Sequence, residues 1–162
     1  MISVAVSTQQ AIRLLVTTAR FADWVSPDIT VAPLTAAPKL SPGDRFRLTL
    51  LGGFAFEYLL EAETDREIVF AFTGPWSGEE RWSFIADGSD TIIRRRYEVR
   101  EGGTLALLAW ETVGRALVLA HFKLELARFR TLAEREPGAR AELEHRPSSP
   151  GAESRGYPID EG

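Results

Sequence analysis

Arginine, glutamate and tyrosine side chains that could take part in binding or catalysis cluster in residues 79–100. The stretch TIIRRRYEV, residues 91–99, places three arginines in a row within a pattern typical of a β-strand. Because side chains alternate between the faces of a strand, Arg95 and Tyr97 share one face, and Arg94 and Arg96 share the other. The pairing predicted below adds Tyr58 and Glu80 to the face of Arg95, so four polar groups converge there.

These four groups allow two kinds of chemistry. A tyrosine near an arginine can donate to a carbonyl and stabilise an enolate, so Tyr97, Arg95 and Glu80 are the candidate catalytic residues. The same groups suit recognition of one carboxylate or carbonyl at the end of an apolar ligand. A third interpretation is structural, with an inward Arg95 that is paired with Glu80 and stacked on Trp82. We expect Arg95 to be the polar anchor of a pocket, and we favour binding over catalysis.

Other common catalytic machinery is missing from the sequence. The chain has no cysteine and two histidines, His121 and His145, which excludes a thiolate nucleophile, a disulfide framework and a His-rich zinc site. We find no HExxH pattern and no phosphate-binding loop, and no serine has a plausible histidine partner. We therefore expect neither a metal nor another cofactor.

The overall charge and composition restrict the partners. A formal net charge of −4 argues against a dedicated nucleic-acid binder, which usually carries a basic surplus. The N-terminus lacks the pattern of a signal peptide, and no uncharged apolar run reaches the roughly 20 residues that span a bilayer. We predict a cytoplasmic protein with no stable membrane insertion.

The hydrophobic pattern changes from helical to alternating and back along the chain. Ile2, Val4 and Val6 indicate a first strand, and Ser7 with Gln10 forms a capping box for the helix that follows. A second short helix is predicted at 21–25 and a short edge strand at 29–34. The alternating region then predicts an antiparallel meander with strands at 44–50, 54–63, 67–73, 79–86 and 91–100. One long helix is predicted at 104–136, followed by a disordered tail at 137–162.

The predicted hairpins fix which side chains share a face. A three-residue turn at 51–53 pairs Leu48 with Phe56 and sorts apolar from charged residues. A loop at 74–78 pairs Phe70 with Trp82. The last hairpin pairs Trp82 with Arg95 and Glu80 with Tyr97, which gives the sheet one aromatic face and one charged face.

One helix cannot fill the hollow of such a wide, curved sheet, so we expect a pocket between them. The predicted ligand-binding residues lie on the inner face of the sheet and on the long helix; they are Phe56, Tyr58, Phe70, Phe72, Glu80, Trp82, Ile93, Arg95, Tyr97, Trp110 and Leu117.

The order of elements and several local stretches resemble a known superfamily. The stretches are VSTQQAIRLLVTTARFADWVSPDI, PGDRFRLTL, RWSFIADGSDTII and the helix ending LELARFRTLAER. Over residues 2 to about 136 they resemble the START/SRPBCC superfamily, and within it the polyketide cyclase/dehydrase and lipid-transport-like proteins. The resemblance implies an α+β helix-grip fold, with a curved antiparallel sheet wrapped around a long C-terminal helix. It defines the predicted domain as residues 1–136.

The resemblance also implies three functions. The first is binding of a small hydrophobic ligand, such as a lipid or polyketide, with one polar end. The second is a cyclase, aromatase or dehydratase that uses the same pocket. The third is a protein-interaction module that resembles ATPase-activator co-chaperones. Separately, the apolar stretch 105–120, interrupted only by Glu111 and Arg115, is compatible with a homodimer.

Overall fold

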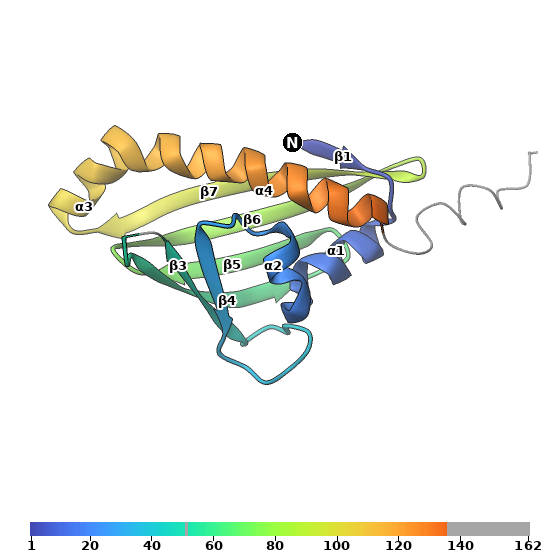
Figure 1. Ribbon diagram of the computed structural model, residues 1–162, viewed down its shortest axis with the longest axis horizontal. Helices are drawn as coiled ribbons and strands as arrows, with labels where there is room; N and C mark the ends of the chain where they lie inside the picture. The colour runs from blue at the N-terminus through green and yellow to red at the C-terminus, as the bar shows by residue number, and fades with distance from the viewer. Residues whose placement is uncertain (51, 136–162) are drawn as a thin grey trace, which may run out of the picture.

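A seven-stranded antiparallel sheet and one long helix dominate the computed structural model, which describes residues 1–50 and 52–135 (Figure 1). The predicted tail and Glu136 lie outside the described residues. The strands are β1 (Ile2–Val4), β2 (Ile29–Pro33), β3 (Arg45–Leu50), β4 (Ala55–Glu63), β5 (Glu67–Thr73), β6 (Trp76–Asp87) and β7 (Asp90–Gly102). The helices are α1 (Thr8–Val16), a 3₁₀ turn (Thr18–Arg20), α2 (Phe21–Trp24), α3 (Thr104–Ala109), a π-helical turn (Trp110–Gly114) and α4 (Arg115–Arg135).

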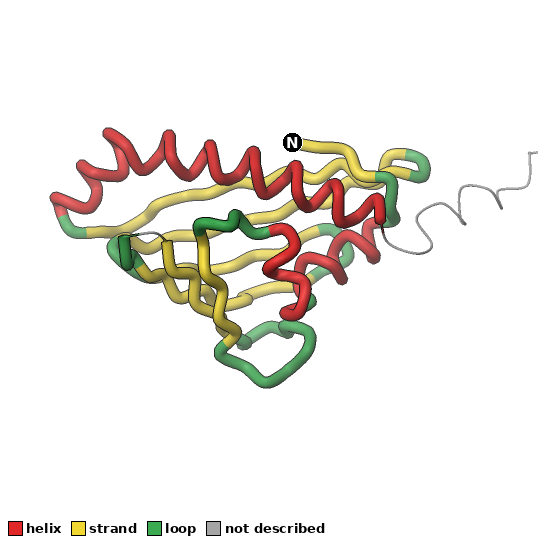
Figure 2. The backbone as a smooth tube through the Cα atoms, in the orientation of Figure 1, coloured by secondary structure: helices red, strands yellow, loops and turns green. Residues whose placement is uncertain are grey.

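The strand order is β1-β7-β6-β5-β4-β3-β2, so the meander is continuous and β1 adds to its far end. The predicted edge strand is β2, which ends at Pro33. The long C-terminal helix runs along one face of the sheet, with α1 and α2 near its C-terminal end and α3 at the opposite end of the molecule (Figures 1 and 2).

Most of the predicted register is confirmed. Leu48 pairs with Phe56 across β3 and β4, and Trp82 pairs with Arg95 across β6 and β7. The β5–β6 register was wrong by two residues, because Phe70 pairs with Glu80 and not with Trp82. The turn is tighter than predicted, and β6 already begins at Trp76. A shift of two residues leaves every side chain on its predicted face, so the aromatic face survives the error.

A β-bulge between Ser77 and Gly78 shapes the β6–β7 hairpin. A Cβ atom at Gly78 would collide with the carbonyl oxygen of Glu98, so this position needs glycine for the close approach of the two strands. At the other end of the fold the predicted capping box is present. The Ser7 hydroxyl accepts from the Gln10 backbone N–H, and the Gln10 side chain accepts from the Ser7 N–H.

The long helix differs from the prediction in two ways. It is not one continuous α-helix, because Trp110–Gly114 forms a π-helical turn. Its second half packs into the core through Leu126, Phe129, Leu132 and Ala133, but in residues 104–120 only Trp110 is buried. Sheet and helix packing therefore does not account for the apolar first half, since Leu105, Leu108 and Leu119 are exposed.

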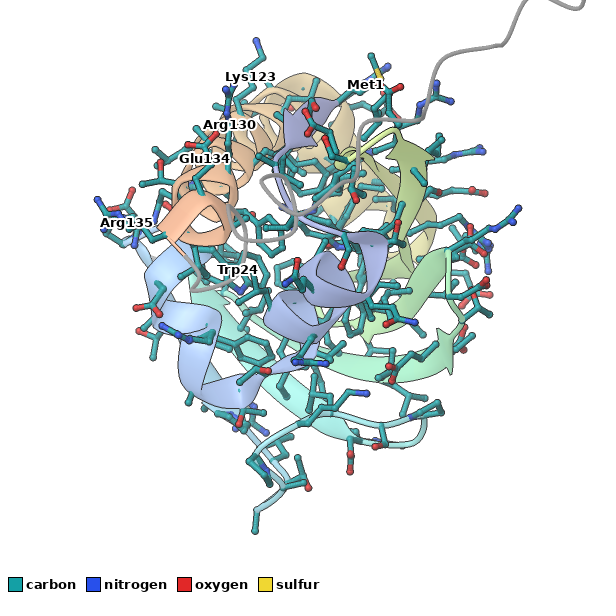
Figure 3. The ribbon with its side chains drawn as sticks, turned by 90° about the vertical axis from the view of Figure 1, so that its right-hand side faces the viewer. Met1, Trp24, Lys123, Arg130, Glu134 and Arg135 are labelled. Carbon is teal, nitrogen blue, oxygen red and sulfur yellow. The ribbon has the colours of Figure 1, made fainter. Side chains whose placement is uncertain are left out.

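The surroundings of α4 are clearest when the molecule is viewed along it. Lys123, Arg130 and Glu134 lie on its outer side, and Trp24 turns toward the interior (Figure 3). Trp24 is buried against Trp82 and Phe129, with ring centroids 5.7 and 6.0 Å away. These aromatic contacts join α2, the sheet and α4 into one core.

Thr104–Arg135 is also long and apolar enough to cross a membrane, judged by length and composition alone. Its C-terminal half belongs to the core of the domain. The expectation of no membrane insertion stays a prediction.

Candidate functional site

A buried ionic cluster lies where the sheet meets α4. The Arg95 Nε donates to Glu80 Oε1 at 2.8 Å, and its Nη1 donates to Glu125 Oε2. The three side chains are between 4 and 6% exposed. Arg95 thus points inward, as predicted, and forms a salt bridge with Glu80.

Other donors also bond to the two carboxylates. Glu80 also accepts from the Trp82 indole at 2.5 Å and from the Tyr58 hydroxyl at 3.3 Å. Glu125 accepts from the backbone N–H of Ser26 at 3.2 Å. Buried charges are tolerated when they are paired and hydrogen-bonded, and this cluster satisfies both conditions.

Two aromatic rings enclose the Arg95 guanidinium. Its central carbon lies 4.5 Å from the Trp82 ring centroid and 3.5 Å from that of Phe122. Burial alone would lower the pKa of Arg95, but attraction to Glu80 and Glu125 outweighs burial and raises it. The guanidinium therefore stays charged at every practical pH.

Both tyrosines beside the cluster stay protonated. Burial raises the pKa of Tyr58 well above its ordinary value, and the nearby charge of Glu80 raises it further. Burial likewise raises the pKa of Tyr97, whose hydroxyl accepts a hydrogen bond from the Trp76 indole at 3.2 Å. At neutral pH each tyrosine is a neutral hydroxyl that can donate, not a phenolate base.

A large apolar cavity of about 360 Å³ opens beside this cluster, between the sheet and the first half of the long helix. This volume is within the range of small-molecule sites. Its lining is mainly aliphatic and aromatic, with a few polar groups: Ile29, Leu48, Leu50, Phe54, Phe56, Tyr58, Pro75, Trp76, Arg95, Tyr97, Ala106, Ala109, Val113, Gly114, Leu117, Val118, His121, Phe122 and Glu125.

A second, inner cavity of about 20 Å³ lies on the core side of the cluster. Glu80, Arg95 and Glu125 all line it, together with Trp24, whose buried indole N–H has no hydrogen-bond partner among residues 1–50 and 52–135. Its size suits a single water molecule and not a ligand head. The ionic cluster therefore separates a space for a ligand from a space for one water.

The structure divides the predicted binding residues between these spaces. Phe56, Tyr58, Arg95, Tyr97 and Leu117 line the large cavity. Three others, Phe70, Glu80 and Trp82, line only the inner one. Phe72, Ile93 and Trp110 line neither of the two; the Phe72 ring stacks on Tyr97, and the Trp110 ring packs against Trp76.

Glu125 is a site residue that was not predicted from the sequence, although a signal was present. Glu125 lies three residues after Phe122 and four before Phe129, which places a charge on the apolar stripe of the helix. A charge on such a stripe predicts a buried partner, and the inward Arg95 was available. His121 also lines the large cavity, and its Nδ1 lies 3.0 Å from the Leu117 carbonyl oxygen.

Several arginines on the outer face of the sheet take part in surface ion pairs. Arg94 and Arg96 are exposed, as predicted. Arg96 lies 3.4 Å from Glu98, while Arg81 pairs with Glu67 and Glu79 at 2.6 and 2.7 Å. Acidic residues therefore interleave with these arginines, which weakens a nucleic-acid interpretation of the run. In residues 1–50 and 52–135 no three His, Asp or Glu side chains form a group that could hold a metal ion.

Comparison with solved structures gives clear matches to the whole arrangement. The solution structure of the Aha1 dimer from Colwellia psychrerythraea is 15% identical, covers 85% of this chain and 95% of that chain, and has a TM-score of 0.62. The KanY protein is 10% identical, covers 82% and 93% of the two chains, and has a TM-score of 0.61. The protein has the helix-grip fold.

The helix-grip fold also matches the di-domain ARO/CYC protein StfQ of the steffimycin biosynthetic pathway. That match is 14% identical with a TM-score of 0.58, and it covers 88% of this chain but 44% of StfQ. No protein-family model and no curated protein matches the sequence. At these identities the likeness establishes the helix-grip fold, and the site must be interpreted from its own residues.

Proposed function

We propose that the protein binds a small, mainly apolar molecule with one polar end in the large cavity. The observation that carries this proposal is the cavity of about 360 Å³, which is walled by apolar and aromatic side chains and bordered on one side by the ionic cluster. Apolar walls provide the hydrophobic driving force, and a few convergent polar groups fix the orientation of a ligand.

A cavity-filling substitution tests the proposal. Val118 lines the cavity, so Val118→Trp should fill part of it and abolish uptake of an environment-sensitive hydrophobic dye. Leu124→Trp is the control, because Leu124 is 45% exposed on the same helix and lies outside the cavity lining. Equal dye binding by the wild type and the Val118→Trp variant would contradict the proposal. Mass spectrometry of the denatured protein should also reveal a co-purified small molecule.

Catalysis in the same cavity is the second candidate, and it is favoured by Tyr97, whose protonated hydroxyl side chain lines the cavity. Structural neighbours that include an ARO/CYC protein agree with this candidate. Glu80 is a weaker choice of base, because it lines only the inner cavity and accepts from Arg95, Trp82 and Tyr58. Turnover of a polyketide-like substrate that is lost in Tyr97→Phe would support an enzyme.

A homodimer is a separate proposal, and the exposed apolar face of Leu105, Leu108 and Leu119 supports it. The two charges in this stretch, Glu111 and Arg115, are both exposed and lie four residues apart. If two copies of the helix paired antiparallel about Val113, each glutamate would face the arginine of the other copy. Two copies of this stretch would therefore pair opposite charges and bury apolar side chains against each other.

Charge reversal tests this pairing by light scattering during size-exclusion chromatography. Arg115→Glu should weaken the dimer, and the double variant Glu111→Arg/Arg115→Glu should restore it. A monomeric wild type would overturn the proposal. If that monomer binds lipid vesicles through Leu105 and Leu108, the face is a membrane contact instead.

A further inference from the structure

We propose that the large cavity selects apolar molecules whose head donates hydrogen bonds, an amine or a hydroxyl, and discriminates against carboxylates. This inference rests on the proposed binding function and specifies its ligand class. It departs from the expectation that Arg95 itself anchors a carboxylate or a carbonyl.

The first observation is the charge count of the cluster. One guanidinium, Arg95, faces two carboxylates, Glu80 and Glu125, and all three side chains are almost fully buried. Each hydrogen bond within the cluster and from its neighbours is donated to a carboxylate oxygen. With both glutamates ionised the cluster has a formal charge of −1. An anionic head placed beside Arg95 would therefore meet two like charges and one opposite charge in a poorly screened site.

The second observation is what each member can still offer a ligand. The faces of the Arg95 guanidinium are covered by Trp82 and Phe122, and two of its five N–H groups, on Nε and Nη1, already donate to the two glutamates. Glu125 lines the large cavity and, among residues 1–50 and 52–135, accepts one hydrogen bond at each carboxylate oxygen. A carboxylate has about four acceptor positions, so Glu125 retains capacity for a ligand N–H or O–H.

The remaining polar groups of the lining are compatible with a donating head. Besides Arg95 and Glu125, the ionisable residues that line the large cavity are Tyr58, Tyr97 and His121. The two tyrosines are neutral, and the ring of Tyr97 lies beside those of Trp110 and Phe122 at centroid distances of 5.4 and 5.7 Å. Aromatic faces attract an ammonium group. A neutral tyrosine hydroxyl can either accept from a ligand head or donate to it, so the tyrosines are compatible with a donating head.

Three probes with the same chain separate the head-group chemistries. Decylamine and decanoate, each below its micelle concentration, and decanol, below its solubility limit, are titrated calorimetrically at neutral pH into the wild-type protein. Decylamine and decanol should each bind at least about tenfold more tightly than decanoate, a difference of about 1.4 kcal/mol. Decanoate binding as tightly as either of the others would overturn this inference and leave the proposed binding function intact. If none of the three binds, the proposed function fails and the inference fails with it.

A charge-neutralising variant tests the source of the selectivity. Glu125→Gln retains the shape of the side chain and removes one negative charge, so the ratio of the decanoate Kd to the decylamine Kd should fall by about tenfold or more. Glu134→Gln is the matched control, because it removes the same charge from an exposed site on the same helix. A ratio that is unchanged in a folded Glu125→Gln variant, or changed equally in both variants, would refute the role of the cluster. If Glu125→Gln does not fold, the wild-type ranking of the three probes still decides the inference.

Discussion

In the second half of the C-terminal helix, Leu126, Phe129, Leu132 and Ala133 are buried, whereas in residues 104–120 only Trp110 is. The first half is the more apolar of the two in sequence, yet it contributes least to the core. One side of it covers the large cavity, and the other side is open to solvent. Apolar residues therefore have two different roles in one helix. In the second half they pack into the core, and in the first half they cover the cavity.

The largest expected contrast between the two halves is in stability. Phe129 has no exposed surface and contacts Trp24 and Trp82, so Phe129→Ala should lower the free energy of unfolding by about 3–5 kcal/mol. Leu119→Ala in the first half should change it by less than about 0.5 kcal/mol, because Leu119 is 52% exposed. Urea denaturation measures both values, and similar losses would show that the two halves pack alike.

The ionic cluster lies where the two halves meet, and its disruption should be nearly as costly. Arg95→Met leaves Glu80 and Glu125 buried without their cation and should cost about 3–5 kcal/mol. Arg96→Met, one residue along on the exposed face, should cost less than about 0.5 kcal/mol.

Adding Glu80→Gln and Glu125→Gln to Arg95→Met should recover part of the loss, since no buried charge then lacks a partner. Equal effects of Arg95→Met and Arg96→Met in urea denaturation would show that the cluster is fully solvated.

The loss of folding stability at alkaline pH indicates how far water is excluded from the cavity under the first half of the helix. Burial raises the pKa of both Tyr58 and Tyr97, so the unfolded chain releases these protons first as the pH rises. The stabilising effect is complete below the ordinary tyrosine pKa of about 10 and is lost above it, by up to about 1.4 kcal/mol per pH unit for each tyrosine.

Thermal unfolding followed between neutral and strongly alkaline pH checks this slope. A Tyr58→Phe/Tyr97→Phe variant should show a shallower alkaline loss than the wild type. The same slope in both proteins would mean that water reaches the two hydroxyls freely and that the cavity is wet.

The smallest effect is expected beyond the packed half of the helix. Residues 140–162 are rich in Pro, Gly, Ser, Glu and Arg, a composition that does not support a core. Their deletion should leave the melting temperature nearly unchanged in differential scanning calorimetry. A large drop would show that this segment docks on the domain, through Tyr157 or Ile159 as the apolar candidates.

Local sequence signals predicted the sheet well, because hairpin register depends on short-range features. The three-residue turn at 51–53 and the apolar–charged alternation were sufficient for the β3–β4 register. The β5–β6 register was missed by two residues because Trp76 and Ser77 had been assigned to the loop, whereas β6 starts at Trp76. Alternation alone cannot detect a slip of two, since both registers keep the same faces.

The candidate site was predictable only in part. The inward direction of Arg95 follows from its place in β7, and the pairing with Glu80 follows from the β6–β7 turn. The contact between Arg95 and Glu125 joins residues 30 positions apart on a strand and a helix, and no local rule specifies it. The π-helical turn was equally hidden, because its sequence, WETVG, has no feature that distinguishes it from an α-helix.

By itself, the sequence determined the antiparallel meander, the two faces of the sheet, the capped first helix and the inward arginine. These features depend on the period of the side chains and on turn chemistry, which act over a few residues. Only the tertiary structure decided that two glutamates share one arginine, that the cavity lies under the first half of the helix, and that Phe70, Glu80 and Trp82 face a space of one water. Those outcomes depend on the distance between sheet and helix, which is set by the packing of all their side chains together.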